Sequence, residues 1–537
     1  MQGRSFVRNG KTLLSGVDPV RRAERTADAV CVSDKTLYFC PSPLYGYGLE
    51  RLLARLEKDA PHCAVLCLEA DAELYELSIE NIPASVTQNK KLHVTNICDA
   101  AALAALVNEL WGAISFRRIE TIRLSGGWQL FPELYDSLCD ALRREIASEW
   151  SNAMTMAKLG RLYIRNTLRN LSLVRHYPSI DNLSFGSAAV LVLGAGPSLD
   201  ETLDALSRCF TAARSFKIIC VDTCLGALKE RGIIPDLAVI LESQHWNIRD
   251  FSGCRNWNVP AAVDFSALPA SSRVLDGQGF LFFTPWTELK IFKRLKDACL
   301  LPAAIPPLGS VGLTAVELAR RLTCGKIICC GLDFSFTHDK YHARSTPGHR
   351  GRLNNQTRFR GILNTAAYES HSAAAVSKSG ISVRTNPAMK NYRNLFENEF
   401  SGDLRLFDIE GSGLPLGIKT LSLEEAMNVL KENLNLPPQN SKDTAGSLCQ
   451  SNSQLTAFFM NEKELLEELK GILTGGTAAC KDRLNLLIDE CDYLWAHFPD
   501  CSGGRLPDFG EISFLKRLRV EIDPMLKLIN LSLRSLT

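Results

Sequence analysis

The chain has 537 residues, 46% hydrophobic and 22% charged, with a formal net charge of +2. At about 100–200 residues per domain this length predicts three or four domains, and the apolar fraction and near-zero charge argue against disorder, nucleic-acid coating and polybasic membrane binding. No apolar run approaches the roughly 20 residues that cross a bilayer, and the first residues lack an apolar core, so neither a membrane span nor a signal peptide is expected.

Residues 1–150 have the pattern of a nucleotide-type α/β unit. A strand, a turn-rich loop, a helix and a second strand with an acidic end follow one another. The loop carries only Gly46 and Gly48, so a purely structural domain and an occupied nucleotide site both stay open. The expected elements are strands at 36–40, 64–70 and 121–127 and a helix at 49–60.

Residues 151–420 have the strongest α/β pattern, after a helical lead-in that begins near residue 137. All-apolar strands alternate with helices, which predicts a mostly parallel sheet covered on both faces. The expected strands are 188–196, 217–222, 236–243 and 326–336, and the expected helices are 200–209, 223–232 and 310–322.

Residues 421–537 are predicted to form a helical bundle that contains a polar linker at 434–454. Ser422 and Glu425 form a capping-box pattern before the first helix, and Pro524 is expected to kink or break the last one. The expected helices are 423–434, 461–473, 481–498 and 511–533.

Eighteen cysteines are the unusual feature of the composition. They are spread through a large chain and often lie in apolar segments, where Cys behaves as a small hydrophobe. There is no CxxC pair, and no spacing favours a zinc site. We therefore predict a reduced, cytoplasmic protein without a structural metal.

The first glycine-rich turn of the central block carries the sharpest local signal. Gly194 and Gly196 follow a strand and let a ligand approach the backbone. Pro197 fixes the chain at the start of a helix, and Ser198 with Glu201 makes a second capping box. Free N–H groups at a helix start attract phosphate, but the third glycine of dinucleotide-binding loops is absent. Phosphate binding and a plain tight turn are equally favoured.

Two acids and a second glycine turn point to the same edge of the predicted sheet. Asp222 and Glu242 close two successive strands, where such folds place contacts to a ribose or base; a surface acid or helix cap is the alternative. Gly309, Ser310 and Gly312 form a second turn into a helix. Two such turns from one parallel sheet could face one ligand, unless the second is an ordinary loop.

Residues 331–361 form a local basic stretch in a nearly neutral protein. After Asp333, at a strand end, its cations could clamp a phosphate or carboxylate, and a histidine could act as general base. Metal binding by His338 and His342 is a minor alternative because no HExxH pattern is present, and a solvated loop is another. The cations are Lys340, Arg344, Arg350, Arg352, Arg358 and Arg360, and the histidines are His338, His342 and His349.

Segments 194–206, 221–243, 308–343 and 406–418, in this order, resemble the motility-associated factor family of bacterial flagellin glycosyltransferases. The central domain of that family is similar to that of bacterial sialyltransferases, and 42–53 followed by 65–77 resembles its N-terminal domain. The resemblance implies an α/β protein in three parts: a Rossmann-like domain (1–150), a central parallel-sheet sialyltransferase-like domain (151–420) and a C-terminal helical bundle (421–537).

The resemblance also implies an activity: transfer of a nonulosonic acid of the pseudaminic, legionaminic or sialic type from a CMP-sugar to Ser or Thr of flagellin, in the cytoplasm. The expected partners are flagellin and the CMP-sugar, without nucleic acid. No tightly bound cofactor is expected, and a requirement for Mg²⁺ is left open.

Site residues carry over from the same resemblance. Gly194, Gly196, Pro197 and Ser198 match the motif that contacts CMP, and Gly309, Ser310 and Gly312 match the later turn. Asp222 and Glu242 stand where sialyltransferases favour Asn, which puts those two contacts in doubt. Lys340 and Arg344 are expected to neutralise the donor phosphate or carboxylate, His342 to be the base, and Asp333 to orient it or bind ribose.

Two other functions stay open. The central region also resembles the archaeal hydroxymethylpterin diphosphokinase group, which would use ATP and Mg²⁺ with Asp222 and Asp333 as metal ligands. A non-catalytic scaffold that binds flagellin is the third reading, because acids replace the expected asparagines.

Overall fold

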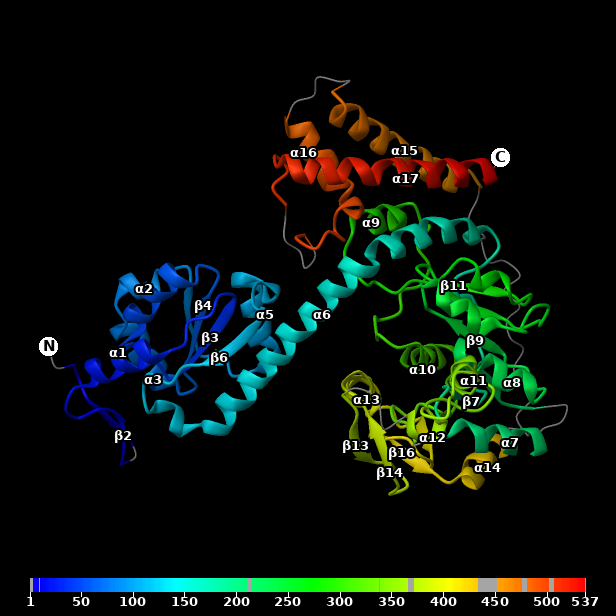
Figure 1. The fold of residues 1–537 in the computed structure, drawn as a ribbon, viewed down its shortest axis with the longest axis horizontal. Helices are drawn as coiled ribbons and strands as arrows, with labels where there is room; N and C mark the ends of the chain where they lie inside the picture. Colours follow the sequence, from blue (N-terminus) through cyan, green and yellow to red (C-terminus); the bar gives the residue numbers. More distant parts are fainter. Residues whose placement is uncertain are drawn as a thin grey trace. The chain divides into compact units, whose positions relative to one another are not determined.

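A computed structural model describes residues 3–8, 10–209, 214–337, 339–365, 371–432, 452–475, 481–501 and 507–536. Its contacts divide the chain into two compact units, Met1–Leu159 with Ala496–Pro507, and Gly160–Trp495 with Asp508–Thr537 (Figure 1). The finer division at residues 150 and 420 stays a prediction. Among the described residues, no helix has the length and apolar character needed to span a bilayer.

The first unit is built on a four-stranded parallel sheet with the order β5-β4-β3-β6. Its two central strands are completely buried runs of apolar residues, which confirms the predicted α/β unit. The strand predicted at 121–127 is wrong: β6 ends at Thr121, and the glycines after it belong to a loop and a 3₁₀ turn. The strands are β3 (Thr36–Pro41), β4 (Ala64–Leu68), β5 (Leu92–Thr95) and β6 (Arg118–Thr121), and the helices are α1 (Pro19–Ala29), α2 (Leu49–Asp59), α3 (Ala72–Asn81), α4 (Ala84–Thr87) and α5 (Ala100–Trp111).

A small N-terminal hairpin, β1 (Phe6–Arg8) and β2 (Lys11–Leu14), packs on this sheet through an apolar cluster. Leu13 and Leu14 are buried in that cluster with Leu44, from the loop after β3. The Gly126 amide donates to the Leu13 carbonyl oxygen at 2.7 Å. The hairpin therefore contacts the loops that leave both β3 and β6.

The second unit contains an eight-stranded sheet in the order β11-β10-β9-β8-β7-β12-β15-β16. All of its strand pairs are parallel, which confirms the parallel sheet expected from the apolar runs. From β7 the chain adds strands outward on one side and then returns with β12 on the other side, so the strand order reverses between β7 and β12. The strands are β7 (Val190–Leu193), β8 (Lys217–Val221), β9 (Leu237–Ile240), β10 (Ala261–Asp264), β11 (Gly279–Phe282), β12 (Ile327–Cys330), β15 (Leu406–Ile409) and β16 (Lys419–Leu421).

Helices and one hairpin surround the sheet. Helix α10 packs against β7, β8, β9 and β12. The hairpin β13–β14 lies between β12 and β15 in sequence and forms its own two-stranded sheet. These elements are α7 (Leu199–Cys209), α8 (Leu225–Glu230), α9 (Lys290–Asp297), α10 (Val311–Leu322), α11 (Pro347–Asn354), α12 (Ile362–Thr365), β13 (Ala373–Val376), β14 (Ser382–Thr385) and α13 (Pro387–Phe400).

Helix α6 (Pro132–Asn170) ends inside the second unit. The side-chain amide of Asn166 donates to the carbonyl oxygens of Ser243 and Ser266, each at 3.0 Å, and Asn170 makes the same kind of bridge one turn later. The two asparagines satisfy loop carbonyls that follow β9 and β10, and so hold α6 at this end of the sheet.

The C-terminal part is helical, as predicted, with three corrections. Helix α15 (Asn452–Leu473) begins inside the expected linker, whose residues 433–451 lie outside the described chain. The helix predicted at 481–498 ends at Glu490, as α16 (Lys481–Glu490), and continues as a 3₁₀ turn. Helix α17 (Ile512–Leu536) runs through Pro524 without a break. Buried Ile522 and Met525 flank that proline, so packing against α15 outweighs a local cost of about 3 kcal/mol.

The capping box before α14 (Leu423–Glu432) is confirmed. The Ser422 amide donates to Glu425 Oε2 at 2.8 Å, and the Glu425 amide donates to Ser422 Oγ at 3.2 Å.

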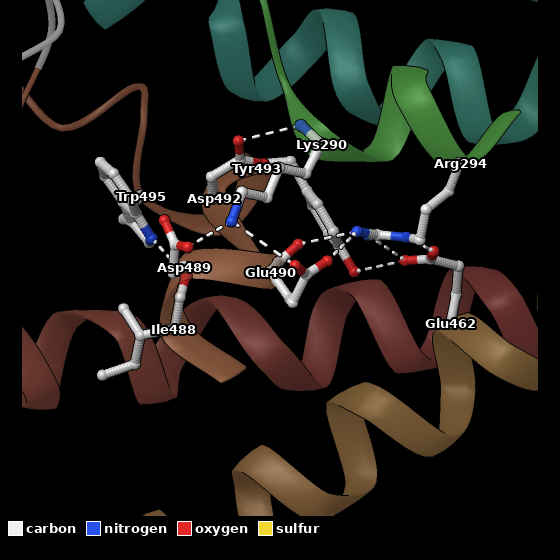
Figure 2. Close-up of polar contacts among 9 residues, drawn as sticks. All are labelled: Lys290, Arg294, Glu462, Ile488, Asp489, Glu490, Asp492, Tyr493 and Trp495. Atoms are coloured by element: carbon white, nitrogen blue, oxygen red, sulfur yellow. Dashed lines mark hydrogen bonds and ion pairs between the residues drawn. The ribbon is translucent and has the colours of Figure 1, made fainter. Parts of the chain in front are cut away.

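A buried ion-pair network joins the C-terminal helices to the α/β part through α9 (Figure 2). Arg294 contacts both carboxylate oxygens of Glu462, at 2.5 and 3.1 Å, and reaches Glu490 Oε2 at 2.9 Å. Glu462 is fully buried and also accepts from the Tyr493 hydroxyl at 3.2 Å. One guanidinium therefore connects α9 with α15 and α16.

Candidate functional site

The glycine turn after β7 lies against the loop after β12, at the point where the strand order reverses. A Cβ on Gly194 would stand 2.4 Å from the Gly331 carbonyl oxygen, and one on Gly196 would stand 2.6 Å from Asp333 Oδ2. Gly331 itself has φ +70°, and the Gly196 amide donates to its carbonyl oxygen at 2.8 Å. Glycine is thus required here by the close approach of two backbones.

Asp333 is buried and holds the end of that turn. Its Oδ2 accepts from the Ser198 amide at 2.7 Å and its Oδ1 accepts from Ser198 Oγ at 2.5 Å. Helix α7 begins directly after Ser198, as expected. The Ser198 amide, which a capping box would pair with Glu201, donates to Asp333 instead, so this half of the expected capping box is wrong. Burial raises the pKa of Asp333, and the positive charge of Lys378 and the two Ser198 bonds oppose that rise.

Lys378 is a residue of this edge that the sequence patterns did not reveal. It lies in the turn between β13 and β14, its side chain is 3% exposed, and its Nζ lies 2.6 Å from Asp408 Oδ2 on β15. Burial raises the pKa of Asp408 to about 6 despite this ion pair. The sequence around residue 378 is polar, and nothing in it indicates that this lysine is buried.

The glycine turn before α10 and the glycine turn after β7 both lie against the side chain of Leu332. Leu332 Cδ2 would lie 2.6 Å from a Cβ on Gly194 and 2.7 Å from one on Gly312. Ser310 caps α10, with its Oγ accepting from the Gly312 amide at 3.3 Å, and Gly309 has φ +67°. The structure therefore brings both turns to the carboxyl ends of β7 and β12, next to the open N–H groups of a twelve-residue helix.

Asp200, in the first turn of α7, contacts two basic residues of the loop after β12. Lys340 Nζ lies 3.0 Å from its Oδ2, and the Arg344 amide donates to its Oδ1 at 3.0 Å. The Arg344 side chain remains 68% exposed, with its Nε 3.8 Å from Asp200. The Ala343 amide also donates to the Ala195 carbonyl oxygen at 2.9 Å. The Lys340 ammonium group is therefore used in an ion pair. The Arg344 guanidinium is mostly exposed to solvent beside the glycine turn, where it can contact a ligand.

His342 is largely enclosed by the same loop. Burial, together with the charge of Arg352 and the nearby His349, lowers its pKa to about 4. Its Nδ1 has no hydrogen-bond partner, and a Cβ on Gly348 would stand 2.9 Å from that atom. The ring is therefore neutral at neutral pH, the form in which it can accept a proton. His338 lies outside the described residues.

Asp222 and Glu242 close β8 and β9 but differ in environment. Asp222 is buried and accepts from the Asn247 side chain at 2.7 Å and from the Thr223 amide at 2.8 Å. Burial, reinforced by Asp250, raises its pKa to about 7. Glu242 is exposed and accepts from the Gln244 amide at 2.8 Å. Asn247 is the partner that the sequence analysis missed, since it lies in a 3₁₀ segment 25 residues from Asp222.

In the described part of the chain, no group of three or more His, Cys, Asp or Glu side chains is arranged to hold a metal ion. Both carboxylate oxygens of Asp222 and both of Asp333 accept hydrogen bonds from other residues of the chain. They lie at the ends of different strands, β8 and β12, which β7 separates in the sheet.

The corresponding edge of the first unit is filled by the chain itself. Ser42, with φ +51°, donates from its Oγ to Glu69 Oε2 at 2.7 Å, and Tyr135 donates to Glu69 Oε1 at 3.2 Å. Ser125 Oγ donates to the Ser42 carbonyl oxygen at 2.5 Å. Burial raises the pKa of Glu69 to about 7. This cluster and the N-terminal hairpin contact the loops at the strand ends of the first unit.

Three comparisons show which known proteins this chain is similar to. Residues 165–339 match the family model described as 6-hydroxymethylpterin diphosphokinase MptE-like. A protein of Treponema pallidum (strain Nichols), described as uncharacterized, is 30% identical over 532 residues, which cover 94% of this chain and 90% of that protein. The MAf glycosyltransferase from Magnetospirillum magneticum AMB-1 has a similar structure, with a TM-score of 0.54 and 13% identity over 99% of this chain and 90% of that one.

An MptE-like α/β domain inside a chain with the MAf glycosyltransferase fold defines the class of protein. The chain belongs to one family with the Treponema pallidum protein. Its fold is the one expected from the resemblance to the motility-associated factor family.

Proposed function

We propose that the protein is a glycosyltransferase that moves a nonulosonic acid, of the pseudaminic, legionaminic or sialic type, from a CMP-sugar to Ser or Thr hydroxyls of flagellin in the cytoplasm. The observation that carries the proposal is the meeting of two glycine turns at Leu332, where the strand order reverses. Open parallel sheets bind their ligands at such reversal points. The fold shared with a glycosyltransferase supports the type of reaction.

The donor's anionic groups find two kinds of positive charge at this edge. The first turn of α10 offers backbone N–H groups, which favour phosphate. Arg344 offers a mostly exposed guanidinium, which can bind a phosphate or a carboxylate through two hydrogen bonds. Lys340, Asp200 and Asp333 hold the loops that carry these groups, and Asp222 with Glu242 lies at the strand ends where a ribose would bind.

In the transfer step, the bond between the anomeric carbon and the phosphate oxygen breaks, and CMP leaves with the bonding electrons. The acceptor oxygen forms the new bond to the anomeric carbon, and its proton passes to a base. Neutral His342 is the base in this proposal, because its uncharged ring has a lone pair that can accept the proton. Its pKa of about 4 makes it a weak base. Arg344 stabilises the negative charge that grows on the leaving phosphate.

The second candidate is an ATP-dependent pyrophosphotransferase that acts on a hydroxymethylpterin. The family model that matches residues 165–339 favours it. Such an enzyme would use Asp222 and Asp333 as Mg²⁺ ligands. The hydrogen bonds that already occupy both carboxylates favour the glycosyltransferase instead.

Nucleotide titration followed by thermal unfolding separates these functions. We expect CMP or CDP to raise the melting temperature, and Arg344→Gln to weaken CMP binding about tenfold through loss of a charge-assisted contact. Arg483→Gln is the matched control, because Arg483 pairs with Glu468 on the surface of the C-terminal helices. Each titration is run with and without Mg²⁺.

Stabilisation by ATP with Mg²⁺ and a pterin, but not by CMP, would sink the glycosyltransferase and support the pyrophosphotransferase. No effect of any nucleotide would favour a non-catalytic flagellin-binding scaffold.

A further inference from the structure

A buried lysine pairs with Asp408 on β15, the strand next to β12, although no sequence motif marks it. Lys378 is held in place by both its backbone and its side chain. Its amide donates to the Gly413 carbonyl oxygen at 2.8 Å, and its Nζ pairs with Asp408. The Leu414 amide in turn donates to the Asp333 carbonyl oxygen at 2.8 Å. The turn of the β13–β14 hairpin is thus tied to the loop after β15, and that loop to Asp333.

The same loop closes over the Ser198 contact. A Cβ on Gly413 would stand 2.8 Å from Asp333 Oδ1, and a Cβ on Gly411 would stand 2.7 Å from Ser198 Cβ. These distances leave no room for water beside the Asp333 carboxylate on that side. Its negative charge must therefore be balanced by the protein.

The charged groups that act on Asp333 come from three places. Lys378 comes from the hairpin, Lys340 from the loop after β12, and Asp408 from the neighbouring strand β15. Lys340 is already paired with Asp200. The side chain of Lys378 is 3% exposed and that of Asp408 is 1% exposed. Lys378 therefore pairs with buried Asp408, and its positive charge also acts on buried Asp333.

We infer that Lys378 is a positioning residue of the candidate site: its buried ammonium group pairs with Asp408, acts electrostatically on Asp333, and so lets Asp333 hold the Ser198 end of the glycine turn. The inference rests on the proposed function only in placing the donor at this turn. The structural role itself, in which a buried cation fixes a loop through a carboxylate, is argued from the contacts and does not depend on the proposed function.

Hydrogen exchange of the 194–200 segment at pH 5.5–8.5 tests this device without any donor or acceptor. The Ser198 amide, which bonds to Asp333, is the reporter. In Lys378→Met, Asp333 takes up a proton at higher pH, because its compensating charge is gone. We expect exchange of this segment to become at least tenfold faster than in the wild type at the acidic end of this range, and to approach the wild-type rate at its alkaline end.

Two variants make the result specific. Asp408→Asn removes the second carboxylate that Lys378 acts on, so the ammonium group then stabilises only the Asp333 carboxylate. The pH at which the 194–200 segment loses protection should therefore fall, whereas in Lys378→Met it should rise. Lys378→Arg keeps the charge and should restore most of the protection. Lys217→Met is the matched control: Lys217 pairs with Asp236 at 3.2 Å and lies on β8 at the amino end of the same sheet.

The inference would be overturned if protection of the 194–200 segment were unchanged in Lys378→Met. It would also be overturned if protection were lost equally at every pH, because that result would indicate that Lys378 acts through packing alone. If Lys378→Met does not fold, the downward shift expected for Asp408→Asn still decides the question. Failure here leaves the proposed glycosyl transfer untouched, whereas a wild-type protein that binds no CMP refutes the transfer and leaves the positioning role intact.

Discussion

Buried carboxyl groups couple this protein to pH at the residue scale. Glu69, Asp222 and Asp408 all lie at carboxyl ends of parallel strands or next to them, and burial raises the pKa of each. A group whose pKa is higher in the folded than in the unfolded chain takes up a proton on folding. Its contribution to stability is therefore greatest at low pH and is lost as the pH rises through the folded pKa.

His342 has the opposite effect. Its folded pKa of about 4 lies below the ordinary value of 6.5, so the unfolded chain binds the proton more tightly in that interval. Stability that depends on His342 falls as the pH drops from about 6.5 to 4.

Glu69→Gln tests the carboxyl effect in the first unit. Glutamine can accept from Tyr135 and donate to Ser42, so it replaces the protonated acid without losing either contact. We expect the variant to gain about 1–3 kcal/mol of unfolding free energy relative to the wild type at pH 8, and much less at pH 5. Urea unfolding at the two pH values measures the difference.

Glu109→Gln is the control, because Glu109 is exposed on α5 and should change stability little at either pH. A gain in Glu69→Gln that is equal at both pH values would contradict the assignment of a proton to buried Glu69.

The sequence predicted which local turns matter in the site but not what they contact. Gly194 and Ser198 were recognised because glycine and serine after an apolar strand have a local meaning. Their partner, Asp333, lies 135 residues later, and nothing in the local pattern shows that the serine hydroxyl turns to it rather than to Glu201. Lys378 was missed because only the tertiary structure buries it.

At the scale of elements, α9 is the attachment point of the C-terminal helices. Its Arg294 satisfies Glu462, which is fully buried, while the backbone amide of Lys290 donates to Asp492 Oδ2 at 3.0 Å. Burial raises the pKa of Asp492 to about 6. Glu462 is thus a fully buried carboxylate whose ion-pair partner is Arg294, and Lys290 makes separate contacts at the edge of the network.

Arg294→Met should therefore destabilise the protein by about 3–5 kcal/mol, because it leaves the Glu462 charge buried without a partner. Adding Glu462→Gln should recover part of that loss, since the two residues interact directly. Thermal unfolding and limited proteolysis of the C-terminal helices measure both effects.

Lys463→Met serves as the control for Arg294→Met. Lys463 is adjacent to Glu462 but makes only a 3.7 Å surface pair with Glu467, worth at most about 0.5 kcal/mol. Equal effects of the two substitutions, or losses that simply add in the double variant, would contradict a buried network centred on Arg294.

Element types were predictable where the hydrophobic period was clear, and boundaries were not. The buried runs of β3, β4, β7, β8 and β9 were all recognised as strands. Strands β10, β11 and β15 were not recognised, although β7 and β9 are equally short. Strand β10 begins with two alanines, β11 begins with a glycine and β15 contains an aspartate, so none has an uninterrupted run of strong strand formers. Pro524 was expected to kink or break α17; the helix does not break there, and it packs on α15.

At the scale of the whole molecule, the order of motifs carried more information than any one of them. Two glycine turns and a basic loop lie far apart in sequence, and a parallel sheet whose order reverses between β7 and β12 brings them to one edge. The first unit has a similar sheet, but its own hairpin and the Ser42–Glu69 pair fill the equivalent position. The proposal assigns the chemistry to the second unit because both glycine turns lie there.

The most direct test of the central claim is the intact mass of flagellin from cells with and without this protein. We predict that flagellin from cells lacking it is lighter by whole nonulosonic acid residues, and that the wild-type gene restores the mass while a gene with Arg344→Gln restores it only in part. Flagellin of unchanged mass in the absence of the protein would contradict the account.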